Sequence, residues 1–307
     1  MSGQLVMEPE QEGTHLATRR PRHGTGKYFA LLVRNPLALT GAIVVVLFVL
    51  VAIFAPLIAP LDPLKQNLRS RLLPPAWSPA GDPQFVLGTD QLGRDLFSRL
   101  IHGSRVAVIV AFSATSLGLA IGVVLGGLAG FFGGLWDTII MRLVDILVSV
   151  PSLVLYLTIM GLAGPSLTLL ILVIGLLGWT TTSRLVRAEV LSLRSREFVE
   201  ASRALGRREG STVFKHVLPN VIGTIVAVGT LKASGVIIAE SSLSFLGFGV
   251  QPPTITWGQM LSTGREYVTT AWWLATFPGI AITLFSLALI FLGNWLRDVT
   301  DPRSKSG

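Results

Sequence analysis

Cysteine is absent from this sequence. Disulfide bonds, thiolate nucleophiles and Cys-ligated metal sites are therefore excluded. Histidine is sparse, with four residues scattered along the chain, and His102 has no partner at the spacing of a triad or a metal site. A packing or capping role for His102 is favoured over chemistry. Because the clustered nucleophiles, bases and ligands of an active site are missing, the sequence predicts neither catalysis nor a metal site on this chain.

Charged residues are also scarce. They make up 14% of the chain, compared with about 25% in soluble domains. Hydrophobic residues account for 50%, and the mean hydropathy is +0.64. The net charge of +8 does not indicate nucleic-acid binding, because the basic residues lie between long apolar runs and form no single stripe. The composition predicts an integral protein of the lipid bilayer.

Six segments are apolar over about the 20 residues that a helix needs to cross the hydrocarbon core. The sequence therefore predicts an all-α, polytopic membrane protein with six transmembrane helices. The predicted spans are Leu37–Ile58, Val106–Phe131, Thr138–Gly161, Ser166–Thr182, Val221–Ala239 and Leu274–Leu296.

The distribution of Lys and Arg predicts the orientation of these spans. Most of the 25 basic residues fall into segments that share one side, which include the N-terminal tail and the long loop between the fourth and fifth spans. Basic loops stay in the cytoplasm, so both termini are expected there. The expected parts are a cytoplasmic tail (1–36) without a signal-peptide cleavage site, the first span with an outer loop (37–104), a transmembrane domain (105–297) and a C-terminal tail (298–307).

Glycines recur at every fourth position from Gly118 to Gly134, and this spacing places them on one helix face. A face without side chains lets another backbone approach closely. Packing within the chain is favoured slightly over a subunit interface near a pore. The predicted packing residues are Gly118, Gly122, Gly126 and Gly130. Upstream, Gly88–Arg105 is amphipathic and is expected to lie at the membrane surface before the second span.

Ionisable residues within the predicted spans are few. Asp145 and Lys232 lie closest to span centres, and Glu240 lies near an end. Because a charge in the bilayer is costly, such residues face the bundle interior or water, and the three are candidates for a translocation path. Intramembrane pairing or snorkelling explains them equally well. Beyond Glu240, a Pro252-Pro253 break ends the helix, and tryptophans that include Trp257 suit the outer headgroup level.

The loop between the fourth and fifth spans, Glu197–Asn220, is the longest cytoplasmic connection and the most charged. Apolar residues at helical spacing predict a short helix, and Gly206 is suited to end it. Leu218-Pro219 closes a second short segment. Two short helices that meet at a glycine form a compact projection, although a helix lying on the bilayer surface is an alternative.

This loop resembles the coupling loop of ABC importer permeases. The family pattern is E-A-A, three residues, G, nine residues, I, one residue and L-P. The letters EASRALG at 200–206 and LP at 218–219 match it at the same spacing. Two positions depart from it, because Ser202 replaces the second alanine and His216 replaces the isoleucine.

Two further stretches resemble one branch of that family. LGTDQLGRDLFSRLIHGSR at 87–105 and SLSFLGFGVQPPTITWGQML at 242–261 are similar to the second of the two permease subunits in the dipeptide, oligopeptide and nickel subfamily. Together with the loop they cover most of the chain after the N-terminal tail.

The resemblance implies a type I ABC importer permease fold in a bacterial cytoplasmic membrane. It further implies partnership with a homologous permease subunit, two cytoplasmic ATPase subunits or domains, and an extracytoplasmic substrate-binding protein. ATP and Mg would be bound by the ATPases, so no cofactor is expected on this chain. The residues that would contact the ATPase are Glu200, Ala201, Ser202, Leu205, Gly206, Leu218 and Pro219.

The expected function is therefore ATP-driven import of dipeptides or oligopeptides. Nickel or another small solute is the alternative within this class. The chain has no G-x-x-x-x-G-K-[ST] loop of its own, so the energy is expected from partner chains. An ion-driven secondary transporter is the rival from another class, but no convincing internal repeat supports it. A channel is disfavoured because no repeated filter-like segment occurs.

Overall fold

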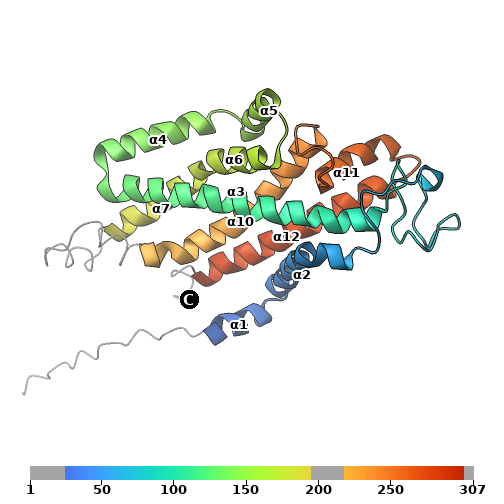
Figure 1. Cartoon of the computed structure of the whole chain (residues 1–307). Coiled ribbons are helices and arrows are strands. Elements are labelled where there is room, and N and C mark those ends of the chain that lie inside the picture. The colour runs from blue at the N-terminus through green and yellow to red at the C-terminus, as the bar shows by residue number, and fades with distance from the viewer. Residues whose placement is uncertain (1–24, 195–217, 301–307) are drawn as a thin grey trace, which may run out of the picture.

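The computed structural model describes residues 25–194 and 218–300 (Figure 1). Across these ranges the regular structure is helical, and Thr89 and Asp95 form an isolated β-bridge. The α-helices are α1 (Thr25–Arg34), α2 (Pro36–Ile58), α3 (Leu96–Phe132), α4 (Gly134–Val148), α5 (Ser152–Ala163), α6 (Leu167–Leu177), α7 (Trp179–Arg194), α10 (Leu218–Phe245), α11 (Trp257–Gly264) and α12 (Trp273–Thr300). Short 3-10 turns lie at Leu68–Ser70 and Arg265–Tyr267.

Five of the predicted spans correspond to helices that are long and apolar enough to cross a bilayer. These are α2, α3, the continuous α6–α7 stretch Leu167–Arg194, α10 and α12. The third predicted span, Thr138–Gly161, is not one straight helix. It is the pair α4 and α5, which meet at an angle of 80° and make a sixth span if the bent pair is counted as one. Pro151 lies at the break, and proline cannot continue a helix there.

The helix that contains the second predicted span begins earlier than that span. Helix α3 starts at Leu96 and has 37 residues, a length of about 55 Å. Asp95 caps its first turn, because its carboxylate accepts a hydrogen bond from the amide of Ser98 at 2.8 Å. The amphipathic stretch Gly88–Arg105 is thus loop in its first half and the start of α3 in its second, and its position at the membrane surface stays a prediction.

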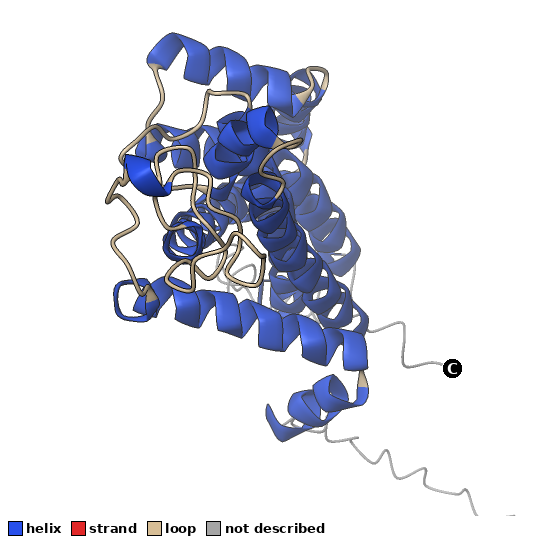
Figure 2. Ribbon diagram, turned by 90° about the vertical axis from the view of Figure 1, so that its right-hand side faces the viewer, coloured by secondary structure: helices blue, strands red, loops and turns tan. Residues whose placement is uncertain are grey.

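The long helices run between two opposite ends of the molecule. Helices α3 and α7 run in the same direction, whereas α10 runs the opposite way beside α12 (Figure 1). The end of α7 and the start of α10 lie together, and we call this the loop end. Residues 59–95, which we call the cap, fold over the opposite ends of the helices, the cap end, as Figure 2 shows.

The core at the cap end is aromatic. Trp257 of α11 is 1% exposed, and Phe48 lies against it with ring centroids 5.4 Å apart. A Cβ atom on Gly103 of α3 would lie 2.5 Å from Cδ1 of this indole, so only glycine leaves room for it. Trp257 therefore faces protein on α3 and α2, and its predicted position at the headgroup level stays a prediction.

Candidate functional site

The predicted coupling loop lies mostly outside the described residues. Glu200, Ala201, Ser202, Leu205 and Gly206 fall in the range 195–217, and Leu218-Pro219 begin α10. The structure does describe the two supports of the loop, which are the end of α7 at Arg194 and the start of α10. The candidate site is therefore described by how these supports are held.

The four glycines of the predicted packing face lie on α3 against the α6–α7 stretch. A Cβ atom added to Gly126 would lie 2.5 Å from the carbonyl oxygen of Ser183, and one on Gly122 would lie 2.5 Å from Cβ of Thr182. A Cβ on Gly130 would lie 2.8 Å from the carbonyl oxygen of Arg187, and one on Gly118 would be 3.2 Å from that of Gly175. We call this contact the seam.

The seam supports the interpretation of these glycines as packing within the chain. Gly134, the fifth glycine of the pattern, does not take part. Its φ is +55°, it begins α4, and a Cβ atom there would meet nothing within 4 Å. The seam therefore ends where α3 turns into α4, and α7 continues to the loop end.

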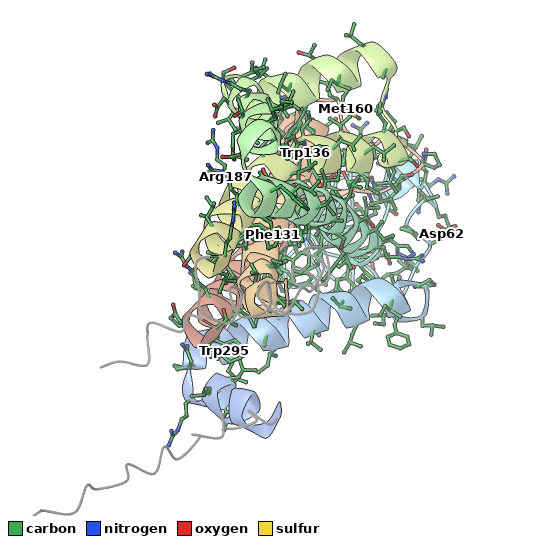
Figure 3. The ribbon with its side chains drawn as sticks, turned by 90° about the vertical axis from the view of Figure 1, so that its left-hand side faces the viewer. Asp62, Phe131, Trp136, Met160, Arg187 and Trp295 are labelled. Carbon is green, nitrogen blue, oxygen red and sulfur yellow. The ribbon has the colours of Figure 1, made fainter. Side chains whose placement is uncertain are left out.

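Helix α4 braces α7 through two ion pairs. The guanidinium of Arg187 donates to both carboxylate oxygens of Asp137, with a distance of 2.7 Å from Nη2 to Oδ2. Arg184 donates to Asp145 at 2.6 Å. Figure 3 shows Arg187 beside the helix that carries Trp136, with Asp62 well away from both. Asp145, predicted as a path residue, is thus paired with α7, the helix that leads to the predicted coupling loop.

Lys232 of α10 contacts the junction of α6 and α7. Its ammonium donates to the carbonyl oxygen of Gly178, which ends α6, and to Oγ1 of Thr182 at 3.0 Å. These two oxygen atoms solvate the ammonium group, which a charge within a membrane span requires. Lys232, also predicted for the path, is engaged with protein groups on a neighbouring helix.

Glu240 lies enclosed at the cap end of α10. It is 2% exposed and accepts hydrogen bonds from the hydroxyls of Ser241 at 3.2 Å and Ser244 at 2.8 Å. Thr256, the N-cap of α11, also hydrogen bonds to it. A Cβ atom on Gly258 would lie 2.6 Å from the carbonyl oxygen of Ser241, so α11 rests directly on α10. The carboxyl group of Glu240 thus links α10 to the start of α11. Its role in the translocation path stays a prediction.

A hollow of about 410 Å³ opens between α5, α10, α11 and α12. Its lining is mainly apolar and includes Leu153, Ile238, Phe245 and Ile282. The three charges predicted for the path are not among its lining residues. Within residues 25–194 and 218–300, no group of three or more His, Asp or Glu side chains is placed to hold a metal ion.

One buried network in the cap is not predicted by the sequence. Asp90 accepts hydrogen bonds from the amides of Leu92 at 2.9 Å and Arg94 at 3.0 Å, and its second oxygen lies 2.6 Å from Nε of Arg94. Nε of Arg99 lies 3.5 Å from that same oxygen, and its Nη1 donates to the carbonyl of Pro63. The signal in the sequence was the alternation of acids and arginines in 88–105, which topology arguments treat only as charge.

Comparison with known proteins agrees with this architecture. Residues 122–306 match the family described as binding-protein-dependent transport system inner membrane component. Residues 29–75 match the family described as N-terminal TM domain of oligopeptide transport permease C. The first match spans α7, α10 and the loop between them.

Individual relatives match over most of their length. The chain is 40% identical to the di/tripeptide transport system permease protein DppC of Pseudomonas aeruginosa over 91% of this chain and 92% of that protein. It is 42% identical to the dipeptide transport system permease protein DppC of Escherichia coli K12 over 89% and 91%. It is 40% identical to the oligopeptide transport system permease protein OppC of Bacillus subtilis over 88% and 86%. The chain therefore belongs to the family of binding-protein-dependent transport system inner membrane components.

Proposed function

We propose that this chain is one of two homologous permease subunits in an ATP-driven importer of dipeptides or oligopeptides. The proposed substrates are taken from the relatives, which are named as permeases for dipeptides, tripeptides and oligopeptides. The observation that carries the mechanism is the loop pattern at 200–219, placed between two helices that are both fixed to the rest of the bundle. Separate ATPase chains, which bind ATP and Mg, supply the energy through this loop.

The arrangement of the helix ends supports a cytoplasmic position for both termini. A Cβ atom on Gly223, near the start of α10, would lie 2.9 Å from Cβ of Thr300 at the end of α12. One on Gly41, near the start of α2, would lie 2.7 Å from the carbonyl of Ala288 in α12, whereas Phe48, farther along α2, packs on Phe285 and Trp257 nearer the cap end, so α2 begins on the side of the loop end. The loop end thus holds the last residues of the final helix, and a loop that meets a cytoplasmic ATPase places the C-terminus on the same side.

The path of force follows from these contacts. An ATPase that closes on nucleotide would displace residues 197–220, and α7 would carry this displacement along the seam to α3. Close backbone contact leaves little room for sliding, so α3 and α7 move as one body. The same movement at the start of α10 reaches α11 at the cap end, where an extracytoplasmic binding protein would deliver the substrate.

The ATPase contact is tested by two substitutions in the loop, Gly206→Trp and Glu200→Lys. Each is expected to reduce copurification of the ATPases and uptake by at least about fivefold, as for a residue central to an interface. Membrane insertion and yield should match those of Gly127→Ala, a substitution on α3 where an added Cβ atom meets nothing within 4 Å. Normal uptake and normal assembly in both loop variants would exclude this loop as the ATPase contact.

The cargo is tested with the purified complex in proteoliposomes together with its binding protein. Dipeptides and longer peptides are expected to stimulate ATP hydrolysis and to accumulate inside. Stimulation by Ni²⁺ with no response to peptides would replace the peptide assignment by a metal one. Uptake driven by a proton or sodium gradient without any ATPase would contradict the ATP-driven mechanism itself.

A further inference from the structure

We propose that Lys232 is a positioning residue that ties α10 to the α6–α7 junction, so that the two helices carrying the coupling loop move together. The proposal rests on the proposed function, because it concerns how the movement of that loop is transmitted. Import of a peptide does not by itself require a charged residue at this position in a membrane span, so the presence of Lys232 there calls for a role.

The position of Lys232 is central. It lies midway along α10, between the loop end at Leu218 and the cap end at Phe245. Its ammonium reaches across to α6 and α7 at once, through the carbonyl oxygen of Gly178 and the hydroxyl of Thr182. One side chain therefore connects three helical segments.

The junction that Lys232 contacts also lies against α3. A Cβ atom on Gly122 would lie 2.5 Å from Cβ of Thr182 and 2.9 Å from the carbonyl of Trp179. One on Gly118 would lie 3.5 Å from the carbonyl carbon of Gly178. Lys232 thus binds the α6–α7 junction, which packs against α3 at the seam, and it links α10 to the unit formed by α3 and α7.

The electrostatics explain why a cation remains at this position. A lysine in a span is costly unless protein groups solvate it, so its ammonium stays with its partners. The turn between α6 and α7 offers the carbonyl oxygen of Gly178, and α7 offers the hydroxyl of Thr182. An apolar side chain would satisfy the bilayer at least as well, but it would leave α10 free to shift along the junction.

The test uses the complete transporter with its ATPases and binding protein in proteoliposomes. The measured quantity is the number of ATP molecules hydrolysed per substrate molecule imported. In Lys232→Met this ratio is expected to rise at least about fivefold, the lower end of typical coupling between sites. Thr182→Val, which keeps the shape against Gly122, is expected to raise the ratio less, and Lys232→Arg is expected to restore most of the coupling.

The matched control is Thr230→Val. Thr230 is on the same helix, but its hydroxyl donates to the carbonyl of Val226 in its own helix and makes no link to α7. The ratio in this variant should equal that of the wild type. A purely structural role for Lys232 would lower the amount of assembled complex and leave the ratio of ATP to substrate unchanged, which would overturn the proposal.

A distance measurement gives a second, independent readout. Because the chain has no cysteine, spin labels attach to it only where cysteines are introduced. Leu191→Cys on α7 and Ile222→Cys on α10 are suitable, since these side chains are 38% and 52% exposed. In the otherwise unchanged chain, the distance between the labels should be the same with and without trapped nucleotide, whereas in Lys232→Met it should change between the two states.

The two proposals fail in different ways. A wild-type complex that imports no peptide in the presence of ATP and the binding protein contradicts the proposed function. A wild-type complex that imports peptide, combined with an unchanged ratio and an unchanged label distance in Lys232→Met, contradicts the role of Lys232 alone.

Discussion

The two ends of the molecule are stabilised by opposite means. At the cap end, a segment without α-helices encloses charged side chains, and Asp90 and Arg99 are 5% and 4% exposed. At the loop end, α3 and α7 meet with almost no side chains between them, at the seam glycines. The ion pair at that end, Arg187 with Asp137, has side chains 32% and 26% exposed. The cap is stabilised by enclosed polar groups. The loop end is stabilised by close contact of the α3 and α7 backbones and by the partly exposed ion pair between α4 and α7.

The difference follows from what each end must satisfy. A buried loop has backbone groups without helical partners, so side chains must supply them. The hydroxyl of Thr89 donates to the carbonyl of Ser70 at 2.5 Å and accepts from the amide of Leu73 at 2.9 Å. Helices have already paired their backbones, so two of them can come as close as their side chains allow. The cap is thus suited to hold a fixed shape, and the seam is suited to transmit movement.

The largest effect is expected at the cap, from Asp90→Asn. The amide keeps an acceptor for the backbone but leaves the Arg99 guanidinium buried without its negative partner. Breaking a buried pair in this way costs about 3 to 5 kcal/mol. The melting temperature of the purified protein should fall, and proteolysis should cut first within residues 59–95.

The control for the cap is Asp62→Asn. Asp62 also accepts from a backbone amide, that of Leu64 at 2.8 Å, but it is exposed, and the ion pairs of the described residues do not include it. Its replacement should change stability by less than about 0.5 kcal/mol, as for ordinary surface positions. Equal losses from Asp62→Asn and Asp90→Asn would mean that turn formation, and not the buried charge pair, stabilises the cap.

A smaller effect is expected at the seam, from Gly126→Ala. The new methyl group would lie 2.5 Å from the carbonyl oxygen of Ser183 and 2.9 Å from its Cα atom, and backbone cannot move aside as a side chain can. Overpacking of this kind costs about 1 to 3 kcal/mol. The loss should appear in thermal unfolding and, if the loop after α7 couples to the ATPases as proposed, in uptake as well.

The next residue provides the matched control for the seam. Gly127→Ala adds the same methyl group to the same helix where nothing lies within 4 Å. Alanine favours a helix over glycine by about 1 kcal/mol, so this variant should be as stable as the wild type or more stable. If the two substitutions had the same effect, helix propensity and not close packing would explain these glycines.

The sequence predicts the helices well because apolar length is a local property. The runs that became α2, α10 and α12 are each long enough to cross the bilayer, and no other part of the chain is needed to recognise them. Direction is less local. Hydropathy predicts one straight span over Thr138–Gly161, and only the break at Pro151 shows that the chain turns by 80° inside it.

The roles of the charges were harder to predict, because they depend on pairs far apart in the chain. Asp145 and Arg184 are 39 positions apart, and Lys232 and Gly178 are 54 apart. One sequence gives the cost of each charge in a membrane but not its partner. From the sequence alone, path lining and pairing therefore explain these charges equally well, and only the arrangement of the helices shows the partners. The glycine pattern predicts its role better than the charges do, because its four-residue spacing already defines a single helix face.

The smallest effect is expected at the loop end, from Asp137→Asn. This substitution breaks the same kind of pair as Asp90→Asn, a carboxylate with an arginine, but water reaches both partners. Pairs of this exposure contribute up to about 1 kcal/mol. High salt distinguishes the two ion pairs further. At about 1 M salt the Debye length is about 3 Å, so the attraction between exposed charges is strongly screened, whereas that between enclosed charges is screened much less. Thermal unfolding of Asp137→Asn should approach that of the wild type in high salt, whereas the deficit of Asp90→Asn should persist. A deficit for Asp137→Asn that is as large as that of Asp90→Asn and insensitive to salt would show that the brace between α4 and α7 is enclosed in the assembled transporter, and the contrast between the two ends would then belong to this chain alone.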